Sequence, residues 1–578
     1  MSILKETIEI LKIFLRKAIN SAIESGDLPE ISGVIPEIYF EFPTNRKHGE
    51  LSSNIAMISA KLFKISPEKI SQKIVAQCLN LGLPSLICKC ESAGVGFINF
   101  YLSNKFYSDV LIEIEKKGLR YGFSDFSSVC AIDEKGFREG GSGVKNVLLE
   151  FVSANPTGPM HMGNARLGAI GDCLAEILKA CNFDVCKEFY VNDTGNQIEK
   201  FGDSLFARFK QIFNKDFPFP EDGYHGEDIK VLAGEFLKIN GDKILSVSEE
   251  HLKKMLIDYA LPKNIEKMKK DLKKYGIIYD SWFYESRLHE NGSVKEVVDK
   301  LTKGGLTYKK DEAIWFSSVN FGAEKDEVLV RRNGTASYFL SDIAYHVDKF
   351  SRRKFGVCIN IWGADHHGHV TRMHAALKAF GIDPERLKII IVQHVHLVRD
   401  GKTDRMSKRS GNLVNLSDFL DEVNKDSARF IFNMQDSNSK MEFDLENAIK
   451  SDLSNPVYYV QYAHARIESI MNSAHKLDFL NPQLDLLDSV QERELIFYLG
   501  TFEYKIMDSA KTLSPEKITG YAMELSALFH KFYNFNKVLC EEKTLAKSRL
   551  FLCKQTLCVL KNVLKMLKVT APERMETS

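Results

Sequence analysis

The chain has 578 residues, and at roughly 150 residues per domain it is expected to hold three or four domains. Hydrophobic residues make up 44% and charged residues 27%, a globular balance that excludes a disordered chain, a collagen-like repeat and a disulfide scaffold. Lys and Arg total 78 against 77 for Asp and Glu, so bulk charge favours neither nucleic-acid nor membrane binding. A polyanionic partner would have to be held by local basic patches.

The first segment, MSILKETIEILKIFLRKAIN, has the apolar spacing of an amphipathic helix and charges throughout, unlike a signal peptide. No apolar run approaches the ~18 residues that a membrane span needs. The 11 cysteines are scattered and include no C-x-x-C pair, which is typical of reduced thiols. We therefore expect a cytoplasmic protein that contacts no membrane.

Residues 1–125 are predicted to form an N-terminal α+β domain. Ser66 followed by Pro67 is a helix start, and residues 97–102 read as a strand entered through Gly94 and Gly96. The glycine-rich, charged stretch 133–146 is typical of a linker.

A nucleotide-binding sheet is predicted next. Residues 147–152 indicate a strand, a helix begins near Gly163, and residues 185–191 alternate as a second strand. A strand, a helix and a strand in this order form the βαβ unit of a doubly wound sheet. Strand patterns at 355–362 and 387–392, with a helix at 371–380 between them, indicate that the same sheet resumes.

Two helical regions complete the chain. Residues from about 200 to 325 are lysine-rich and helical, with a capping box at Ser246 and Glu249, and indicate an insertion into the sheet domain. From 455 onward the pattern is almost entirely helical, and apolar positions from Leu550 to Leu567 recur every three or four residues, as in a bundle. The fold class is therefore α/β: a Rossmann-type parallel-sheet catalytic domain with insertions over 126–454, flanked by an α+β domain over 1–125 and an all-α bundle over 455–578.

The first candidate site is the turn over residues 155–164, which follows the first sheet strand. Its prolines and glycines set a tight turn that ends at a helix N-terminus, where unpaired backbone N–H groups favour an anion. His161 can add a donor aimed at a phosphate, and Gly163 lets a nucleotide approach the backbone. The same pattern also fits a turn whose histidine only caps the helix.

The second candidate site is the basic segment 405–412, which begins Arg405-Met406-Ser407-Lys408. Three cations within five residues suit a pyrophosphate whose charge grows as it leaves, although such a run also fits a solvated surface loop.

The third candidate site is residues 363–369, Gly-Ala-Asp-His-His-Gly-His, which follow a predicted strand. Asp365 at the sheet edge can accept ribose hydroxyls, as acids do in dinucleotide folds. One Asp and three His residues can also bind a metal, which leaves a metal site as an open alternative.

The fourth candidate site is the helix around residues 338–346. Tyr338 and Asp342 are four residues apart and so share one helix face. With Glu150 on the first strand there are two acids for one pocket, and a planar guanidinium is their natural ligand because carboxylates bind it bidentately. A helix cap or a surface ion pair would give the same residues.

Together these motifs resemble a class I aminoacyl-tRNA synthetase, specifically an arginyl-tRNA synthetase. The family's HIGH signature is His161-Met162-Gly163-Asn164 here, and its KMSK signature is Arg405-Met406-Ser407-Lys408. Further matching text, in the family's order and over essentially the whole chain, is KHGELSSNIA, GVGFINFYL, EFVSANPTGPMHMGNAR, FYVNDTGNQI, WFYES, SYFLSDIAYHVDKF, GADHHGHV, NPVYYVQYAHARI and APERM.

The resemblance implies a tRNA-core-binding N-terminal domain, an anticodon-binding C-terminal domain, and attachment of L-arginine to its tRNA through an arginyl-adenylate. It implies ATP with Mg²⁺ as cosubstrate, no tightly bound metal, arginine tRNA as partner and a monomer. The implied catalytic residues are His161, Asn164, Arg405 and Lys408. The implied ATP-binding residues are His161, Gly163, Asn164, Gly363, Asp365, His366, Met406, Ser407 and Lys408, and the implied arginine-binding residues are Glu150, Asn155, Tyr338 and Asp342.

Two positions depart from the family's signatures. Asn164 replaces the second histidine of HIGH, so we expect an altered nucleotide contact with activity retained. Arg405 replaces the first lysine of KMSK and keeps the charge without the compact ammonium. Three alternatives stay open: another class I synthetase such as the cysteinyl enzyme, a metal-dependent hydrolase using the histidines at 366–369, and a tRNA-binding relative without catalysis.

Overall fold

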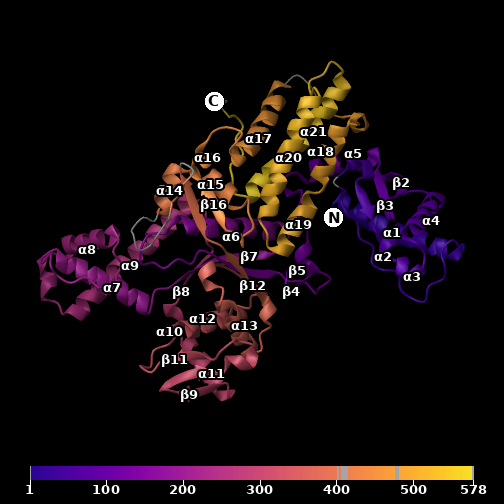
Figure 1. Cartoon of the computed structure of the whole chain (residues 1–578). Coiled ribbons are helices and arrows are strands. Elements are labelled where there is room, and N and C mark those ends of the chain that lie inside the picture. Colours follow the sequence, from indigo (N-terminus) through magenta and orange to yellow (C-terminus); the bar gives the residue numbers. More distant parts are fainter. Residues whose placement is uncertain (1, 44, 400–401, 405–413, 475–480, 576–578) are drawn as a thin grey trace.

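A computed structural model describes residues 2–43, 45–399, 402–404, 414–474 and 481–575. Figure 1 shows a central sheet with the N-terminal domain in indigo on one side and a bundle of yellow helices above it. Two insertions extend from the sheet on its other sides, one built from α7–α9 and one that carries β9–β11. Among the described residues, no helix is long and apolar enough to cross a bilayer. The eleven cysteines are free thiols.

The N-terminal domain packs helices on a small antiparallel sheet with strand order β1-β3-β2. Its α4 starts with Ser66 as N-cap and Pro67 in the first turn, which confirms the predicted helix start. The bounds are α1 (Ile3–Glu24), β1 (Leu51–Ser53), α2 (Ile55–Ile58), α3 (Ala60–Phe63), α4 (Pro67–Leu81), β2 (Ile87–Ala93), β3 (Phe97–Leu102) and α5 (Asn104–Lys117).

The stretch predicted as a linker is partly a hairpin. β4 (Cys130–Asp133) and β5 (Gly136–Glu139) pair antiparallel, with Asp133 opposite Gly136. Gly136 has φ +129°, and a Cβ there would lie 2.2 Å from the Lys511 carbonyl oxygen. This glycine therefore serves the close packing of the hairpin on the C-terminal domain, and the linker prediction was wrong for these residues.

The catalytic domain is built on a five-stranded parallel sheet with order β13-β12-β6-β7-β8. Three of its strands were predicted with small errors at their ends: β6 (Asn146–Glu150), β7 (Asp184–Val191) and β12 (Val357–Gly363). β13 (Leu387–Val392) has the predicted bounds, and β8 (Ser281–Tyr284) was not predicted. The strand order reverses direction between β6 and β12, so the crevice at their carboxyl ends is the expected place for a nucleotide.

Helices and a second small sheet complete this domain. α6 (Met162–Ala180) follows β6 and is buried along most of its length, as a crossover helix between parallel strands must be. The other elements are α12 (Tyr338–Val347), α13 (His369–Ala379), β14 (Val395–Arg399), β15 (Lys402–Asp404), α14 (Leu416–Glu422), α15 (Lys425–Phe432), β16 (Met441–Asp444) and α16 (Leu445–Ile449).

The region 200–325 is only partly helical. Its first part is α7 (Asn196–Gln211), α8 (Glu227–Asn240) and α9 (Glu249–Lys274), and α9 is capped by Ser248 and not by the predicted Ser246. The chain then returns to the main sheet as β8. The second insertion is a mixed unit of α10 (Ser286–Glu290), α11 (Ser293–Lys303), β9 (Thr307–Lys310), β10 (Ala313–Phe316) and β11 (Glu327–Val330).

The C-terminal domain is a helical bundle. Its apolar stripe from Leu550 to Leu567 is buried, which confirms the predicted core face. The last helix also contacts the N-terminal domain, where Lys554 pairs with Glu115 at 2.7 Å. The bounds are α17 (Pro456–Ser473), α18 (Val490–Gly500), α19 (Phe502–Thr512), α20 (Glu516–Phe535) and α21 (Lys543–Met566).

Candidate active site

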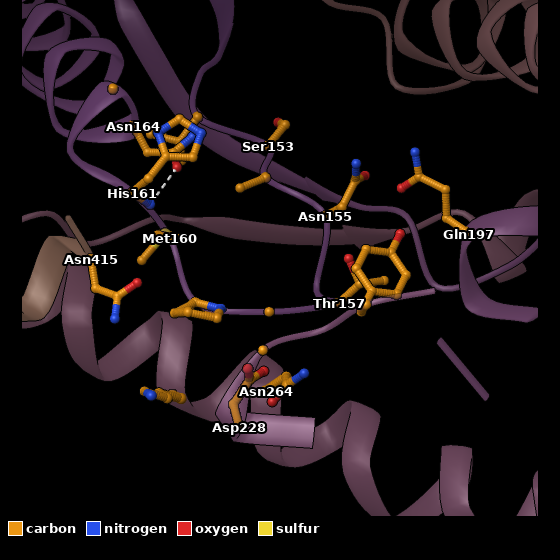
Figure 2. Close-up of a pocket in the computed structure, with 18 of the residues that line it drawn as sticks. Ser153, Asn155, Thr157, Met160, His161, Asn164, Gln197, Asp228, Asn264 and Asn415 are labelled. Atoms are coloured by element: carbon orange, nitrogen blue, oxygen red, sulfur yellow. Dashed lines mark hydrogen bonds between the residues drawn. The ribbon is translucent and has the colours of Figure 1, made fainter. Parts of the chain in front are cut away.

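A cavity of about 2510 Å³ opens at the carboxyl ends of β6 and β12, between the sheet and the α7–α9 insertion. Figure 2 shows the turn after β6 on one side and Asp228 and Asn264 of the insertion on the other. Seven of the predicted site residues line this cavity: Asn155, His161, Gly163, Asn164, Gly363, Asp365 and His366. They come from two distant parts of the chain, and the switch in strand order brings them together.

The turn of residues 155–164 ends at the N-terminus of α6, with His161 as the N-cap residue. The Asn164 side-chain oxygen accepts the His161 backbone N–H at 3.0 Å, which caps the first turn of the helix (Figure 2). Asn164 therefore stiffens the turn in addition to lining the cavity. The positive end of the helix dipole at this turn is favourable for an anion.

The turn is also held against the chain that follows residue 413. The Met162 N–H donates to the Val414 carbonyl oxygen at 3.1 Å, and the Leu416 N–H donates to Met160 at 2.8 Å. Asn415 lines the cavity between them. The predicted residues Arg405, Met406, Ser407 and Lys408 lie outside the described residues. The described chain resumes at Val414, and there it pairs with the HIGH turn.

Residues after β12 form the side of the cavity next to the nucleotide-binding edge. Asp365 is exposed, and its carboxylate lies 3.6 Å from the His394 imidazole. His366 and His367 are exposed as well. The histidines of this segment do not converge, because His369 is turned to Asp342 and lies 2.7 Å from its carboxylate.

Glu150 is buried at the end of β6 and is neutralised by a cation. Its Oε2 accepts a hydrogen bond from the buried Lys349 ammonium at 2.6 Å, and its Oε1 accepts one from Ser153 at 3.1 Å. Glu150 does not line the cavity, but Ser153 does. Glu150 is therefore placed one side chain behind the cavity wall.

The same network continues to α12. Lys349 also donates to the Asn360 side-chain oxygen at 3.1 Å, and the Asn360 amide lies 2.8 Å from His346 Nε2. His346 Nδ1 lies 2.8 Å from the Asp342 carbonyl oxygen. Burial lowers the pKa of His346 to about 3, so this histidine is neutral at physiological pH.

Asp342 presents a charged carboxylate beside this network. Its side chain is 34% exposed, and its Oδ2 lies 2.7 Å from His369 Nε2. Burial acts to raise the pKa of Asp342, but the hydrogen bond with His369 and the nearby positive charge together outweigh it, so the pKa lies below its usual value. Asp342 is therefore ionised across the neutral range.

Tyr338, four residues before Asp342, is exposed at the start of α12. The Arg331 guanidinium lies 5.6 Å from the centre of its ring. A Cβ added at Gly195 would lie 3.9 Å from the ring, so the loop after β7 packs against Tyr338. Neither Tyr338 nor Asp342 lines the large cavity. Asp342 is connected to it through His369, whose ring lies 5.3 Å from that of Trp362, the residue before Gly363 of the cavity wall.

Three further residues around the cavity were not predicted. Gln197 lines the cavity, and its buried side-chain oxygen has no hydrogen-bond partner among the described residues. Glu285 is buried close to Asp342, and burial raises its pKa. Arg166 is fully buried on α6 and donates to the carbonyl oxygens of Gln393, Asp436 and Ser439, which fixes the cavity wall after β13. All three residues stand in the quoted motif text, but their roles depend on contacts between distant segments.

Three protein-family models match the chain. The model for the catalytic domain of class I (R) tRNA synthetases matches residues 132–472. The arginyl tRNA synthetase N-terminal domain matches residues 11–102, and the DALR anticodon binding domain matches residues 460–575.

Curated relatives match over nearly the full length. The arginine–tRNA ligase of Caldanaerobacter subterraneus is 48% identical over 99% of this chain and 100% of its own, and that of Acetivibrio thermocellus is 46% identical over 97% of both. The solved arginyl-tRNA synthetase of Thermus thermophilus has the same fold, with a TM-score of 0.72 and 20% identity over 98% of this chain and 100% of its own.

The parallel sheet, the cavity at its switch point and the helical C-terminal domain define a class I aminoacyl-tRNA synthetase. Within this class, the matching catalytic and N-terminal domain models and the full-length relatives are all of the arginine-specific kind. The chain belongs to the arginyl-tRNA synthetase family.

Proposed function

We propose that the residues around the cavity carry out the two steps of arginine–tRNA ligation. In the first step an arginine carboxylate oxygen attacks the α-phosphorus of ATP, and the bond to the bridging oxygen breaks to release pyrophosphate. In the second step a hydroxyl of the terminal tRNA ribose attacks the arginyl carbonyl and releases AMP. Both steps depend on positioning and on stabilisation of negative charge.

The ATP side of the cavity is assigned to the HIGH turn and the loop after β12. His161, Gly163, Asn164 and the N-terminus of α6 would hold the phosphate at which charge develops, and Gly363, Asp365 and His366 would hold the nucleoside. This assignment is supported by the position of all six residues on one cavity. Mg²⁺ would enter with ATP as part of the substrate.

Lys408, with Arg405, Met406 and Ser407, would hold the departing pyrophosphate. The support is the backbone pairing of Val414 and Leu416 with the HIGH turn, because these residues follow the basic segment closely in the sequence.

The arginine side is assigned to Asp342, Tyr338, Glu150 and Asn155. Asp342 would bind the guanidinium with Tyr338 beside it, and Asn155 would bind the amino-acid end. Glu150 would act through Ser153, because its own charge is balanced by Lys349. The observation that carries the proposal is an ionised and partly exposed Asp342 carboxylate, which His369 and Trp362 connect to the cavity wall at Gly363.

The experiment is Asp342→Asn in a tRNA-charging assay, with Asp109→Asn on the surface of the N-terminal domain as the matched control. Loss of a charged hydrogen bond of about 1.5–3 kcal/mol raises the arginine KM roughly 10- to 150-fold. The ATP KM should stay within about threefold, because the nucleotide contacts other residues. Equal changes in both KM values would refute the assignment of Asp342.

The domains flanking the sheet are assigned to tRNA. Residues 1–125 would contact the tRNA core, residues 126–454 would carry the chemistry, and residues 455–578 would bind the anticodon. The match of residues 460–575 to an anticodon binding domain supports the last assignment. The chain is proposed to act as a cytoplasmic monomer.

Discrimination against other amino acids would come from the guanidinium pocket itself. Lysine or a neutral analogue would leave a charged carboxylate without its bidentate partner. Polar discrimination of this kind reaches about 10⁴-fold, so no editing domain is required.

A further inference from the structure

His369 connects Asp342 to a second charged pair. The Arg372 Nε–H donates to His369 Nδ1 at 2.6 Å, and His369 Nε2 lies 2.7 Å from Asp342 Oδ2. On its other side Arg372 lies 3.5 Å from Glu327 of β11. His369 itself is 7% exposed.

The direction of these hydrogen bonds sets the tautomer of His369. An arginine Nε–H only donates, so His369 Nδ1 must accept and carries no proton. The ring proton is therefore on Nε2, where it is donated to Asp342. A second proton on His369 would have to displace the Arg372 hydrogen bond at Nδ1.

This tautomer has a consequence for charge. Lys349 balances the charge of Glu150, and Arg372 lies against Glu327. A neutral His369 orients the Asp342 carboxylate without cancelling its charge. A protonated His369 would instead form an ion pair with Asp342 and compete with a cationic substrate.

We propose that His369 is a positioning residue that Arg372 keeps in its neutral form, so that Asp342 retains its negative charge for the arginine guanidinium. The proposal rests on the proposed function of Asp342. Packing adds to the positioning, because the Trp362 and Phe339 rings lie 5.3 Å and 5.7 Å from the His369 ring.

Other charged groups also surround the pair of Asp342 and His369. On α12 and the helical turn after it, His346 is neutral and Lys349 is held by Glu150. Among the described residues, the other titratable groups near Asp342, His369 or the neighbouring Trp362 ring are Tyr190, Glu285, Glu327, His366 and Arg372. A test must therefore isolate the His369 ring from these groups.

The test is the pH dependence of the arginine KM in Arg372→Met. Methionine keeps the unbranched apolar stem of the side chain but cannot donate to Nδ1, and an imidazole with a free nitrogen can take up a proton at mildly acidic pH. We expect the arginine KM of this variant to rise about tenfold from pH 8 to pH 6, whereas that of the unmodified protein changes less than about twofold. The ATP KM should show no such rise in either protein.

The double variant His369→Gln with Arg372→Met is the matched control. Glutamine keeps an N–H donor for Asp342 and cannot be protonated, so the pH dependence should disappear. A flat arginine KM in Arg372→Met, or a rise that persists in the double variant, would overturn the proposal. The variant Glu327→Gln tests whether the neighbouring Glu327 carboxylate causes the pH dependence of the arginine KM.

A second comparison covers the case in which Arg372→Met does not fold. His369→Gln is expected to keep the arginine KM within about threefold, and His369→Phe, which keeps the ring packing but lacks the donor, to raise it about tenfold. Equal KM values in these two variants would overturn the proposal.

If Asp342→Asn leaves the arginine KM unchanged, the proposed arginine site and this inference both fail. If Asp342→Asn raises it but the His369 and Arg372 variants behave alike, only this inference fails.

Discussion

Asp172→Asn is expected to destabilise the catalytic domain strongly, because Asp172 joins two buried cations. Its carboxylate lies 2.9 Å from the Lys187 ammonium and 2.7 Å from the Arg429 guanidinium. Asp172 and Arg429 are fully buried. Arg429 also donates to the carbonyl oxygens of Tyr275 and Leu567, so the cluster links α6 to the insertion and to the end of α21.

The expected loss follows from burial of unpaired charge. Removing one partner of a buried pair costs about 3–5 kcal/mol, and at about 2–4 °C per kcal/mol the melting temperature should fall by roughly 6–20 °C. Burial acts to raise the pKa of Asp172, but Arg429 and Lys187 outweigh it and lower the pKa. The stabilisation is therefore complete above the unfolded value of about 3.9 and is lost as the pH falls through the lower folded value.

Thermal unfolding followed by circular dichroism at pH 7 measures this loss. The matched control is Glu312→Gln, which breaks the pair with Arg332 at the surface and should change the melting temperature by less than about 2 °C. The double variant Asp172→Asn with Arg429→Met should lose less stability than the sum of the losses in the two single variants, because the two residues are in contact. A decrease in melting temperature of less than about 2 °C for Asp172→Asn would refute the reasoning, as would losses that are fully additive in the double variant.

Two further predictions concern the HIGH turn and tRNA. Asn164→Ala removes the cap on the His161 N–H and should cost about 1 kcal/mol, seen as a melting temperature lower by about 2–4 °C, whereas Asn164→Asp keeps the acceptor and most of the stability. Identical melting temperatures for both variants would argue against the cap. The tRNA affinity should fall at least a hundredfold between about 50 and 200 mM salt in an anisotropy titration, because phosphate contacts release counterions. A flat response would contradict binding through phosphates.

The main sheet was predictable because its elements carry strong local patterns. β6, β12 and β13 are mainly apolar runs, β7 alternates, and α6 follows β6 with regular apolar spacing. The HIGH turn and the loop after β12 could also be located, because each directly follows one of these strands.

The missed elements are short or are defined by distant partners. β8 has four residues and follows a long helix, so nothing local distinguishes it from the insertion. β4 and β5 pair across a tight turn in a charged, glycine-rich stretch that reads as a linker.

The partners in the site were the least predictable part. Lys349 balances Glu150 although 199 positions separate them, and His369 meets Asp342 across 27 positions. Such pairs depend on which strands are neighbours in the sheet. A local pattern therefore identified both acids but not that Lys349 already balances the charge of Glu150.

Arginine-dependent ATP–pyrophosphate exchange, with and without arginine tRNA and against all twenty amino acids, tests the function most directly. We expect exchange with arginine and with no other amino acid when tRNA is present. Exchange with a different amino acid would contradict the arginine pocket around Asp342. No exchange with any amino acid, while tRNA is bound, would contradict catalysis by this chain.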